Sequence, residues 1–174
     1  MGQEPKPFPL EARLGTVLGL LELVVAYGGK ADLALIAREL RVELDDILPA
    51  SEAAEQLGLL KIEDGEGVAT PLGVRVSRSL AKGKKKILKE QLPQLEPFTT
   101  AIRLAKEKPE GFTTEDLASA LSANEKLAGY LERIDTLHEL LVDWMLYTEL
   151  LSYDGDSRLF KTRSRRTYHS SSLE

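Results

Sequence analysis

The sequence predicts a mainly α-helical protein with short β-hairpins, organised as two tandem winged-helix (winged helix-turn-helix) modules. Residues 57–71 contain a glycine that can end a helix, two alternating apolar positions and an Asp-Gly-Glu-Gly turn, which is typical of a helix leading into a hairpin. Three helical patterns precede this stretch, and three helices followed by a hairpin form the winged-helix order. The order recurs in the second half, where residues 150–160 form the matching hairpin, so we expect two copies of one module.

The first helix is expected over residues 14–27. Its apolar side chains form a stripe that widens almost all round the helix, so we expect it to lie centrally and to be covered on several sides. The apolar run contains Glu22 and is shorter than the roughly 18–20 residues that a membrane-spanning helix needs. Gly15 and Gly19 share one face, which predicts the close approach of another backbone there.

Two shorter helices are expected next. Residues 31–40 carry apolar side chains at helical spacing, and residues 44–57 form the third helix, which would enter the major groove in a DNA-binding winged helix. Asp45 or Asp46 is its expected N-cap, and Pro49 is expected near the first turn, where proline is tolerated. After the first hairpin, residues 74–80 are predicted to resume as helix.

The second half contains the longest helical pattern. Residues 81–86 combine glycine with a basic run and form the expected module boundary. Shorter helices are then expected over 87–95, 97–106 and Thr114–Leu121, the last capped by Thr113 or Thr114. From 124 to 147 apolar residues recur at three- and four-residue steps, which predicts one long helix.

These elements divide the chain into four parts. We expect an extended, proline-rich linker over residues 1–9, a first winged-helix module over 10–81, a second over 82–162, and a disordered basic tail over 163–174.

Charge and cysteine content limit the classes of function. The chain has no cysteine, which excludes disulfides and thiolate metal sites and fits a reducing compartment, so we expect a cytoplasmic protein. The net charge of −5 and the pI near 5.3 argue against nucleic acid or an anionic membrane as the main partner. The predicted third helix, 44–57, contains acidic residues and no Lys or Arg, whereas a DNA-reading helix must meet phosphate, so DNA is not expected as a partner.

No residue pattern predicts catalysis, a cofactor or a metal site. The sequence has no Ser-His-Asp or G-x-S-x-G pattern, and Gly28-Gly29-Lys30 lacks both the spacing and the following Ser or Thr of a phosphate-binding loop. His138 has carboxylates nearby, but a lone helical histidine is more often solvated or ion-paired than bound to metal. We therefore expect no enzymatic activity and no cofactor.

Two clusters of basic residues stand apart from the acidic remainder. They comprise Lys82 with residues 84–86, and Arg163, Arg165 and Arg166. A solvated linker and a flexible tail explain both clusters. The alternative is contact with lipid headgroups or with an acidic partner surface.

The aromatic residues near the end of the chain have two interpretations. In the first, Trp144 and Phe160 belong to the core and close the second hairpin onto the long helix, because such rings bury a large apolar area. In the second, Trp144, Tyr147, Tyr153 and Asp154 form a partner-binding face.

Three segments carry a resemblance to a known family: residues 13–23 (RLGTVLGLLEL), 27–33 (YGGKADL) and 143–154 (DWMLYTELLSYD). They resemble the AAA-associated C-terminal domain, which follows the ATPase domain in ATP-binding proteins of nitrate/sulfonate/bicarbonate-type ABC importers. The resemblance extends from about residue 8 to about residue 160. The Walker and signature motifs of the ATPase half are absent, so the chain is expected to be an excised domain or a free-standing relative.

The resemblance implies a non-catalytic regulatory or interaction domain on the cytoplasmic side of an importer, at the inner face of the membrane. Its expected partner is the ATPase domain or subunit of the transporter, and a homodimer is left open. The alternatives are a winged-helix transcription regulator that contacts DNA through its basic segments, and a tandem winged-helix adaptor that binds another protein. The transported solute and any regulatory ligand stay open.

Overall fold

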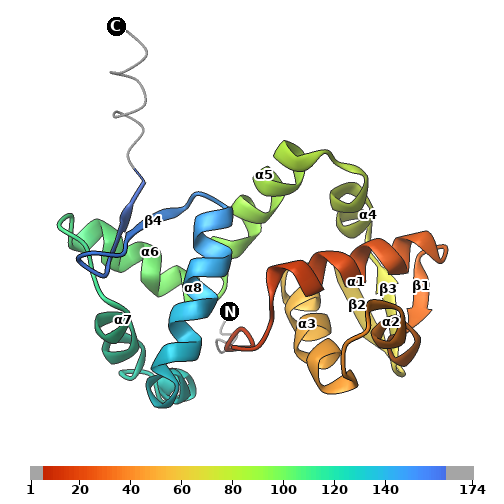
Figure 1. Cartoon of the computed structure of the whole chain (residues 1–174), viewed down its shortest axis with the longest axis horizontal. Coiled ribbons are helices and arrows are strands. Elements are labelled where there is room, and N and C mark those ends of the chain that lie inside the picture. Colours follow the sequence, from red (N-terminus) through yellow and green to blue (C-terminus); the bar gives the residue numbers. More distant parts are fainter. Residues whose placement is uncertain (1–5, 164–174) are drawn as a thin grey trace, which may run out of the picture.

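The chain forms two lobes that a pair of helices connects at one edge (Figure 1). The computed structural model describes residues 6–163. The mainly helical fold with short antiparallel hairpins, predicted from sequence, is confirmed. The predicted tail over 163–174 lies outside the described residues except for Arg163.

The first lobe is built around α1 (Leu14–Ala26), which packs against α2 (Leu33–Leu40) and α3 (Leu44–Gln56). The expected central position of α1 is confirmed, because α1 also contacts α4 and the strands β1 and β3. Its fully buried residues, however, lie on one face of the helix and not almost all round it. The expected backbone contact at its two glycines is wrong. A Cβ on Gly15 would meet nothing within 4 Å, and one on Gly19 would meet only the side chain of Leu40.

A three-stranded antiparallel sheet completes the first lobe. Strands β2 (Leu60–Glu63) and β3 (Glu66–Ala69) form the predicted hairpin, with Asp64 and Gly65 at positive φ in its turn. The third strand, β1 (Lys30–Asp32), pairs with β3 and was not predicted, because three residues are too few to show alternation. Asp32 ends β1 and caps α2, where its carboxylate accepts from two backbone N–H groups.

The start of α3 differs from the prediction. The helix begins at Leu44, its N-cap is Glu43, and neither Asp45 nor Asp46 caps it. Both aspartates lie in the first turn, where their charge complements the helix dipole. Pro49 falls inside the helix, in its second turn and not near the first as expected.

The connection between the lobes is helical, so residues 81–86, expected as a module boundary between two helices, lie inside a helix. Helix α4 (Pro71–Arg78) begins at its cap Thr70, and α5 (Ala81–Gln91) contains the whole basic run. The glycine in that run serves close packing, because a Cβ on Gly83 would lie 2.9 Å from that of Ser79 at the end of α4.

The second lobe repeats the element order of the first. After the short helix η1 (Leu92–Gln94) come α6 (Phe98–Glu107), α7 (Thr114–Leu121), η2 (Glu125–Glu132), α8 (Ile134–Tyr147) and the hairpin of β4 (Leu151–Asp154) with β5 (Leu159–Thr162). A single antiparallel bridge between Phe112 and Phe160 occupies the place that β1 has in the first lobe. The predicted capping of α7 is confirmed, with Thr113 and Asp116 forming a capping box.

The predicted long helix from 124 to 147 is wrong. The structure breaks it at Arg133 into the 3₁₀ helix η2 and the α-helix α8. The break turns the ring of Tyr130 inward, where it is 3% exposed, and apolar spacing alone could not reveal this change of direction.

One continuous set of buried apolar side chains runs through both lobes. Among residues 6–163, none of the helices has the length and apolar character needed to cross a lipid bilayer.

Candidate functional site

The N-terminal strap, residues 7–12, passes between the lobes (Figure 1). Phe8 anchors it there. Phe8 is 1% exposed, and its ring meets those of Phe98 and Trp144 edge-on, at centroid distances of 5.1 and 5.2 Å. Its backbone N–H donates to the carbonyl oxygen of Glu96 at 2.9 Å. Phe8 therefore belongs to the core of the second lobe although it precedes the first lobe in sequence.

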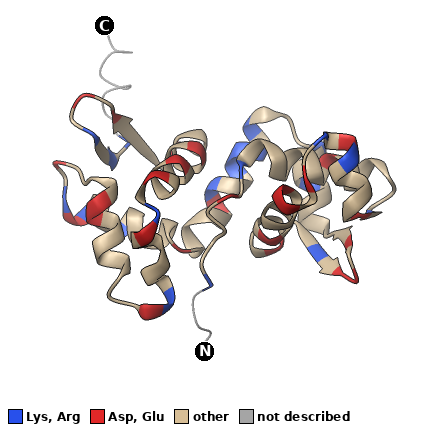
Figure 2. Ribbon diagram, turned by 60° about the horizontal axis from the view of Figure 1, so that its bottom comes forward, with Lys and Arg blue, Asp and Glu red and all other residues tan. Residues whose placement is uncertain are grey.

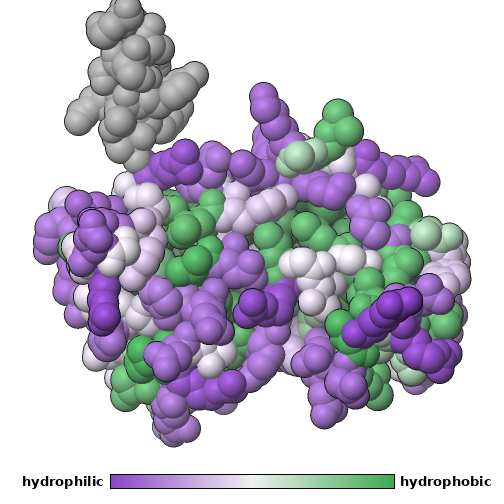
Figure 3. Space-filling model, in the orientation of Figure 1, coloured by the Kyte–Doolittle hydropathy of each residue, from purple (hydrophilic) through white to green (hydrophobic). Residues whose placement is uncertain are grey.

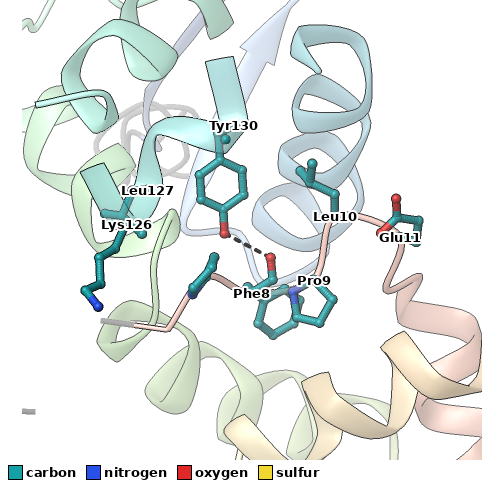
Figure 4. A pocket seen from close by; sticks show the side chains of 9 residues that line it. Phe8, Pro9, Leu10, Glu11, Lys126, Leu127 and Tyr130 are labelled. Carbon is teal, nitrogen blue, oxygen red and sulfur yellow. Dashed lines mark hydrogen bonds between the residues drawn. The ribbon is translucent and has the colours of Figure 1, made fainter. Parts of the chain in front are cut away.

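Tyr130, from η2, closes over the strap. Its hydroxyl donates to the carbonyl oxygen of Phe8 at 2.9 Å (Figure 4) and lies 3.3 Å from that of Glu96. Burial raises the pKa of Tyr130 far above its usual value, and the charge of Glu96 adds to the effect. The hydroxyl therefore stays protonated and remains a donor.

Helix α8 holds the other end of the strap, where α1 begins. The indole Nε1 of Trp144 donates to the carbonyl oxygen of Ala12 at 2.9 Å, and the carboxylate of Asp143 accepts from the backbone N–H of Leu14 at 2.8 Å. Helix α1 has no side-chain cap from its own N-cap residue, so Asp143 supplies the missing acceptor and a favourable charge at the helix N-terminus. The second lobe thus fixes the first turn of the central helix of the first lobe.

A cavity of about 260 Å³ lies between the strap and η2 (Figure 4). It is lined by Pro7, Phe8, Pro9, Leu10, Glu11, Lys126, Leu127, Gly129 and Tyr130. Small-molecule sites typically have volumes of roughly 300–1,000 Å³, so this cavity suits one inserted side chain better than a ligand. Arg133 forms an ion pair with Glu11 beside it.

A second cleft, of about 330 Å³, lies between α7, α8 and the β4–β5 hairpin. The Thr114 hydroxyl and His138 Nδ1 are 2.7 Å apart in it, and the His138 ring packs edge-on against Tyr153 at 5.0 Å. Arg158 and Glu115 add charges of both signs. Within the part of the chain that the structure describes, no three His, Asp or Glu side chains gather as metal ligands, so this cleft offers hydrogen bonds and charge rather than a metal site.

The four residues of the predicted partner-binding face have different environments. Trp144 is fully buried under the strap and contributes no surface. Tyr147 lies half-buried beside α5, with Lys85 Nζ 6.0 Å from its ring centroid, and burial raises its pKa. Tyr153 packs against Phe160 and lines the second cleft, whereas Asp154 is exposed at the end of β4.

Two carboxylates near these residues are held in their charged form. The hydroxyl of Ser157 and the backbone N–H of Asp156 donate to Asp154 and lower its pKa. The ammonium of Lys85 donates to Glu149 at 2.9 Å and holds the pKa of that carboxyl below its usual value. This pair ties α5 to the end of α8.

The residues that join the lobes were not predicted from the sequence. Phe8 lay in a predicted linker, and Tyr130 in a predicted regular helix. The one available signal for Phe8 was a phenylalanine between two prolines in a polar segment. Exposing a large apolar ring to water is unfavourable, so such a residue is expected to pack against other apolar side chains.

Comparison with known proteins gives one match. The family model described as the C-terminal AAA-associated domain matches residues 35–154, which is more than half of the chain. The matched region begins within α2 and ends with β4, so it includes most of the first lobe and nearly all of the second. Neither the curated proteins nor the solved structures gave a match.

Proposed function

Since the chain belongs to the family of C-terminal AAA-associated domains, we propose that it is a non-catalytic domain that acts by protein–protein contact on the ATP-binding subunit of an ABC importer. The transporter would be of the nitrate/sulfonate/bicarbonate type, and the domain would work at the cytoplasmic face of the membrane. In this role it would alter the rate of ATP turnover by favouring one arrangement of the ATPase subunits.

The anchored strap is the observation that carries this proposal. In the setting that the resemblance implies, an ATPase domain precedes this one, and its chain would arrive at Pro7. Because Phe8 is buried and hydrogen-bonded to the second lobe, the arriving chain would have a fixed point of attachment at the junction of the lobes. A fixed attachment restricts the positions that a neighbouring ATPase domain can adopt, which a flexible linker would not do.

We further propose that both lobes are winged-helix modules, with α3 and α8 in the recognition position and the two hairpins as wings. The matching order of elements and the β1-β3-β2 sheet support this assignment. This assignment would give modules over 10–81 and 82–162. The strap would then pack against the second module although it lies at the start of the chain.

The exposed charge of the first module favours a protein partner over DNA. On α3, Asp45, Asp46 and Glu52 are exposed and the helix contains no Lys or Arg, while Glu63 is exposed on the wing. We call these four exposed carboxylates the acidic face; their charge would repel phosphate and suits a basic protein surface. We propose that it docks on the ATP-binding subunit, with a second copy of the chain as the competing partner.

The test is binding to the purified ATP-binding subunit, together with its rate of ATP hydrolysis. We expect the chain to bind and to change the rate, and we expect Glu52→Lys with Glu63→Lys to weaken both effects. Glu110→Lys with Glu132→Lys makes the same change of charge at exposed positions of the second lobe and is the matched control.

Three outcomes would contradict the proposal. If the wild-type chain neither binds nor alters hydrolysis, the assignment to an importer is wrong. If both double variants weaken binding equally, the acidic face is not the docking surface. If the chain forms a dimer that the Glu52 and Glu63 changes dissolve, with no binding to the ATPase, the face is a self-association surface.

A further inference from the structure

The turn between α4 and α5 carries the most exposed large apolar side chain of the described residues. Leu80 is 85% exposed, whereas Leu48, Leu44, Leu131 and Tyr27 are between 45% and 47% exposed. Figure 3 shows a small group of hydrophobic atoms that projects above the region of α4 and α5, with hydrophilic atoms around it. An apolar side chain held so far out in water has no structural partner.

Four exposed basic residues lie within six positions of Leu80 along the chain. Arg75 and Arg78 lie one turn apart on α4, and Lys82 and Lys86 lie one turn apart on α5. All four are exposed, and within residues 6–163 none of them has a carboxylate at ion-pair distance. Figure 2 shows Lys and Arg gathered along α5, while Asp and Glu are spread over both lobes.

The neighbouring lysines that do have partners make the turn rigid. Lys84 Nζ donates to the carbonyl oxygens of Ser77 and Ser79, at 3.3 and 2.7 Å, and forms an ion pair with Glu22. Lys85 pairs with Glu149. Lys84 therefore holds the α4–α5 corner in place and Lys85 ties α5 to the second lobe, whereas Lys82 and Lys86 are exposed to solvent.

We propose that Leu80, Arg75, Arg78, Lys82 and Lys86 form a basic tip that docks on an anionic lipid surface. The four cations would lie over lipid phosphates, and Leu80 would enter the boundary between headgroups and acyl chains. The inference does not depend on the importer partner.

The shape of the tip favours a bilayer over an acidic protein. A stable protein interface buries roughly 800 Å² on each side with complementary shape, whereas the tip is a convex corner with one apolar side chain. A bilayer requires no shape complementarity and accepts a single inserted leucine. The net charge of −5 on the whole chain would then orient the molecule, because the acidic remainder is repelled by the same lipids that attract the tip.

The test is co-sedimentation of the full chain with vesicles. We expect binding to vesicles that contain phosphatidylglycerol, no binding to pure phosphatidylcholine, and loss of binding as salt is raised. Leu80→Ser should lower the partition coefficient roughly tenfold, and each of Lys82→Gln and Lys86→Gln roughly fivefold. Leu48→Ser and Lys106→Gln, at exposed positions away from the tip, should leave it unchanged.

A second measurement reports insertion directly. Because the chain has no cysteine, Leu80→Cys can be labelled at one position with a polarity-sensitive fluorophore. Emission should shift to the blue on phosphatidylglycerol vesicles, and the matched Leu48→Cys label should show no shift.

Four results would overturn the inference. These are no binding to phosphatidylglycerol at low salt, unchanged binding by Leu80→Ser, no blue shift at position 80, or tighter binding to duplex DNA than to vesicles with no dependence on Leu80. The last result would identify the tip as a nucleic-acid contact.

Discussion

Phe8 shows how much of the architecture depends on one side chain outside the repeated elements. Its ring fills the space between Phe98 and Trp144, and its backbone joins Glu96 and Tyr130. No neighbouring residue of the strap has comparable burial except Ala12, which accepts the Trp144 hydrogen bond.

Phe8→Ala should destabilise the chain by about 3–5 kcal/mol, because it removes a fully buried ring and leaves a cavity beside two others. Urea unfolding followed by circular dichroism measures the change. Leu48→Ala, at a half-exposed position on α3, is the control and should change the free energy of unfolding by about 0.5 kcal/mol or less. A loss below about 1 kcal/mol for Phe8→Ala would show that the strap is not anchored as described.

Tyr130 makes stability depend on pH at the alkaline end. Its pKa is raised in the folded state, whereas an unfolded tyrosine ionises near pH 10. Below about pH 10 both states hold the proton, and above it only the unfolded chain loses it, so stability falls as pH rises.

Tyr130→Phe should cost about 1 kcal/mol at neutral pH, through the lost hydrogen bond to Phe8. Above about pH 10 its disadvantage should shrink by about 1.4 kcal/mol per pH unit, because the variant has no group to ionise there. Urea unfolding of both proteins at neutral and alkaline pH measures the difference. A difference that stays constant with pH would mean that Tyr130 ionises normally in the folded state.

At the scale of elements, the glycines of two helices have opposite roles. Gly73 lies in the first turn of α4, where an added Cβ would come within 2.0 Å of the backbone carbonyl oxygen of Leu59. Gly15 lies in the first turn of α1, where an added Cβ meets nothing within 4 Å. Because Gly73 has no Cβ, α4 can pack directly against the backbone of Leu59, which lies between α3 and β2.

Gly73→Ala and Gly15→Ala should therefore change stability in opposite directions. Gly73→Ala should destabilise by about 3 kcal/mol or more, because a backbone carbonyl cannot move aside as a flexible side chain can. Gly15→Ala should stabilise by up to about 1 kcal/mol through helix propensity. Thermal unfolding of the two variants tests the pair, and a shift of the same sign in both would contradict the described packing of α4.

At the scale of the whole molecule, two separate sets of contacts join the lobes. The strap and the first turn of α1 are held by α8, through Trp144 and Asp143. On the other side, Gln91 from α5 donates to the carbonyl oxygen of Leu57 at 3.1 Å. A lobe that unfolds alone would therefore break contacts in the other.

We expect one cooperative unfolding transition. Trp144 is the single tryptophan and lies in the second lobe, so its fluorescence reports that lobe, whereas far-ultraviolet circular dichroism reports the helices of both. The two signals should give the same midpoint in urea. Phe8→Ala is the informative variant, because loosening the strap should separate the two midpoints. Different midpoints in the wild-type chain would show that the lobes unfold independently.

The placement of charge is also a property of the whole molecule. The acidic face on α3 and its hairpin, the strap at the junction of the lobes and the basic tip at the α4–α5 corner occupy different surfaces. A domain arranged in this way could contact an ATP-binding subunit and a lipid surface at the same time, since neither proposed contact uses the residues of the other.

By itself the sequence determined the mainly helical class, the two hairpins and the general order of the elements, because periodicity, Asp-Gly turns and capping residues act between near neighbours along the chain. It also determined the acidic character of α3 and the family. Only the tertiary structure decided three features that depend on long-range contacts: Phe8 leaves the linker for the core, the helix pattern breaks at Arg133, just after Tyr130, and Trp144 is buried and not part of a binding face. It also decided that a basic run predicted as a linker forms a rigid corner with Leu80 at its tip. These outcomes depend on partners as many as 132 positions away, as in the bond from Trp144 to Ala12, and local patterns carry no information about them.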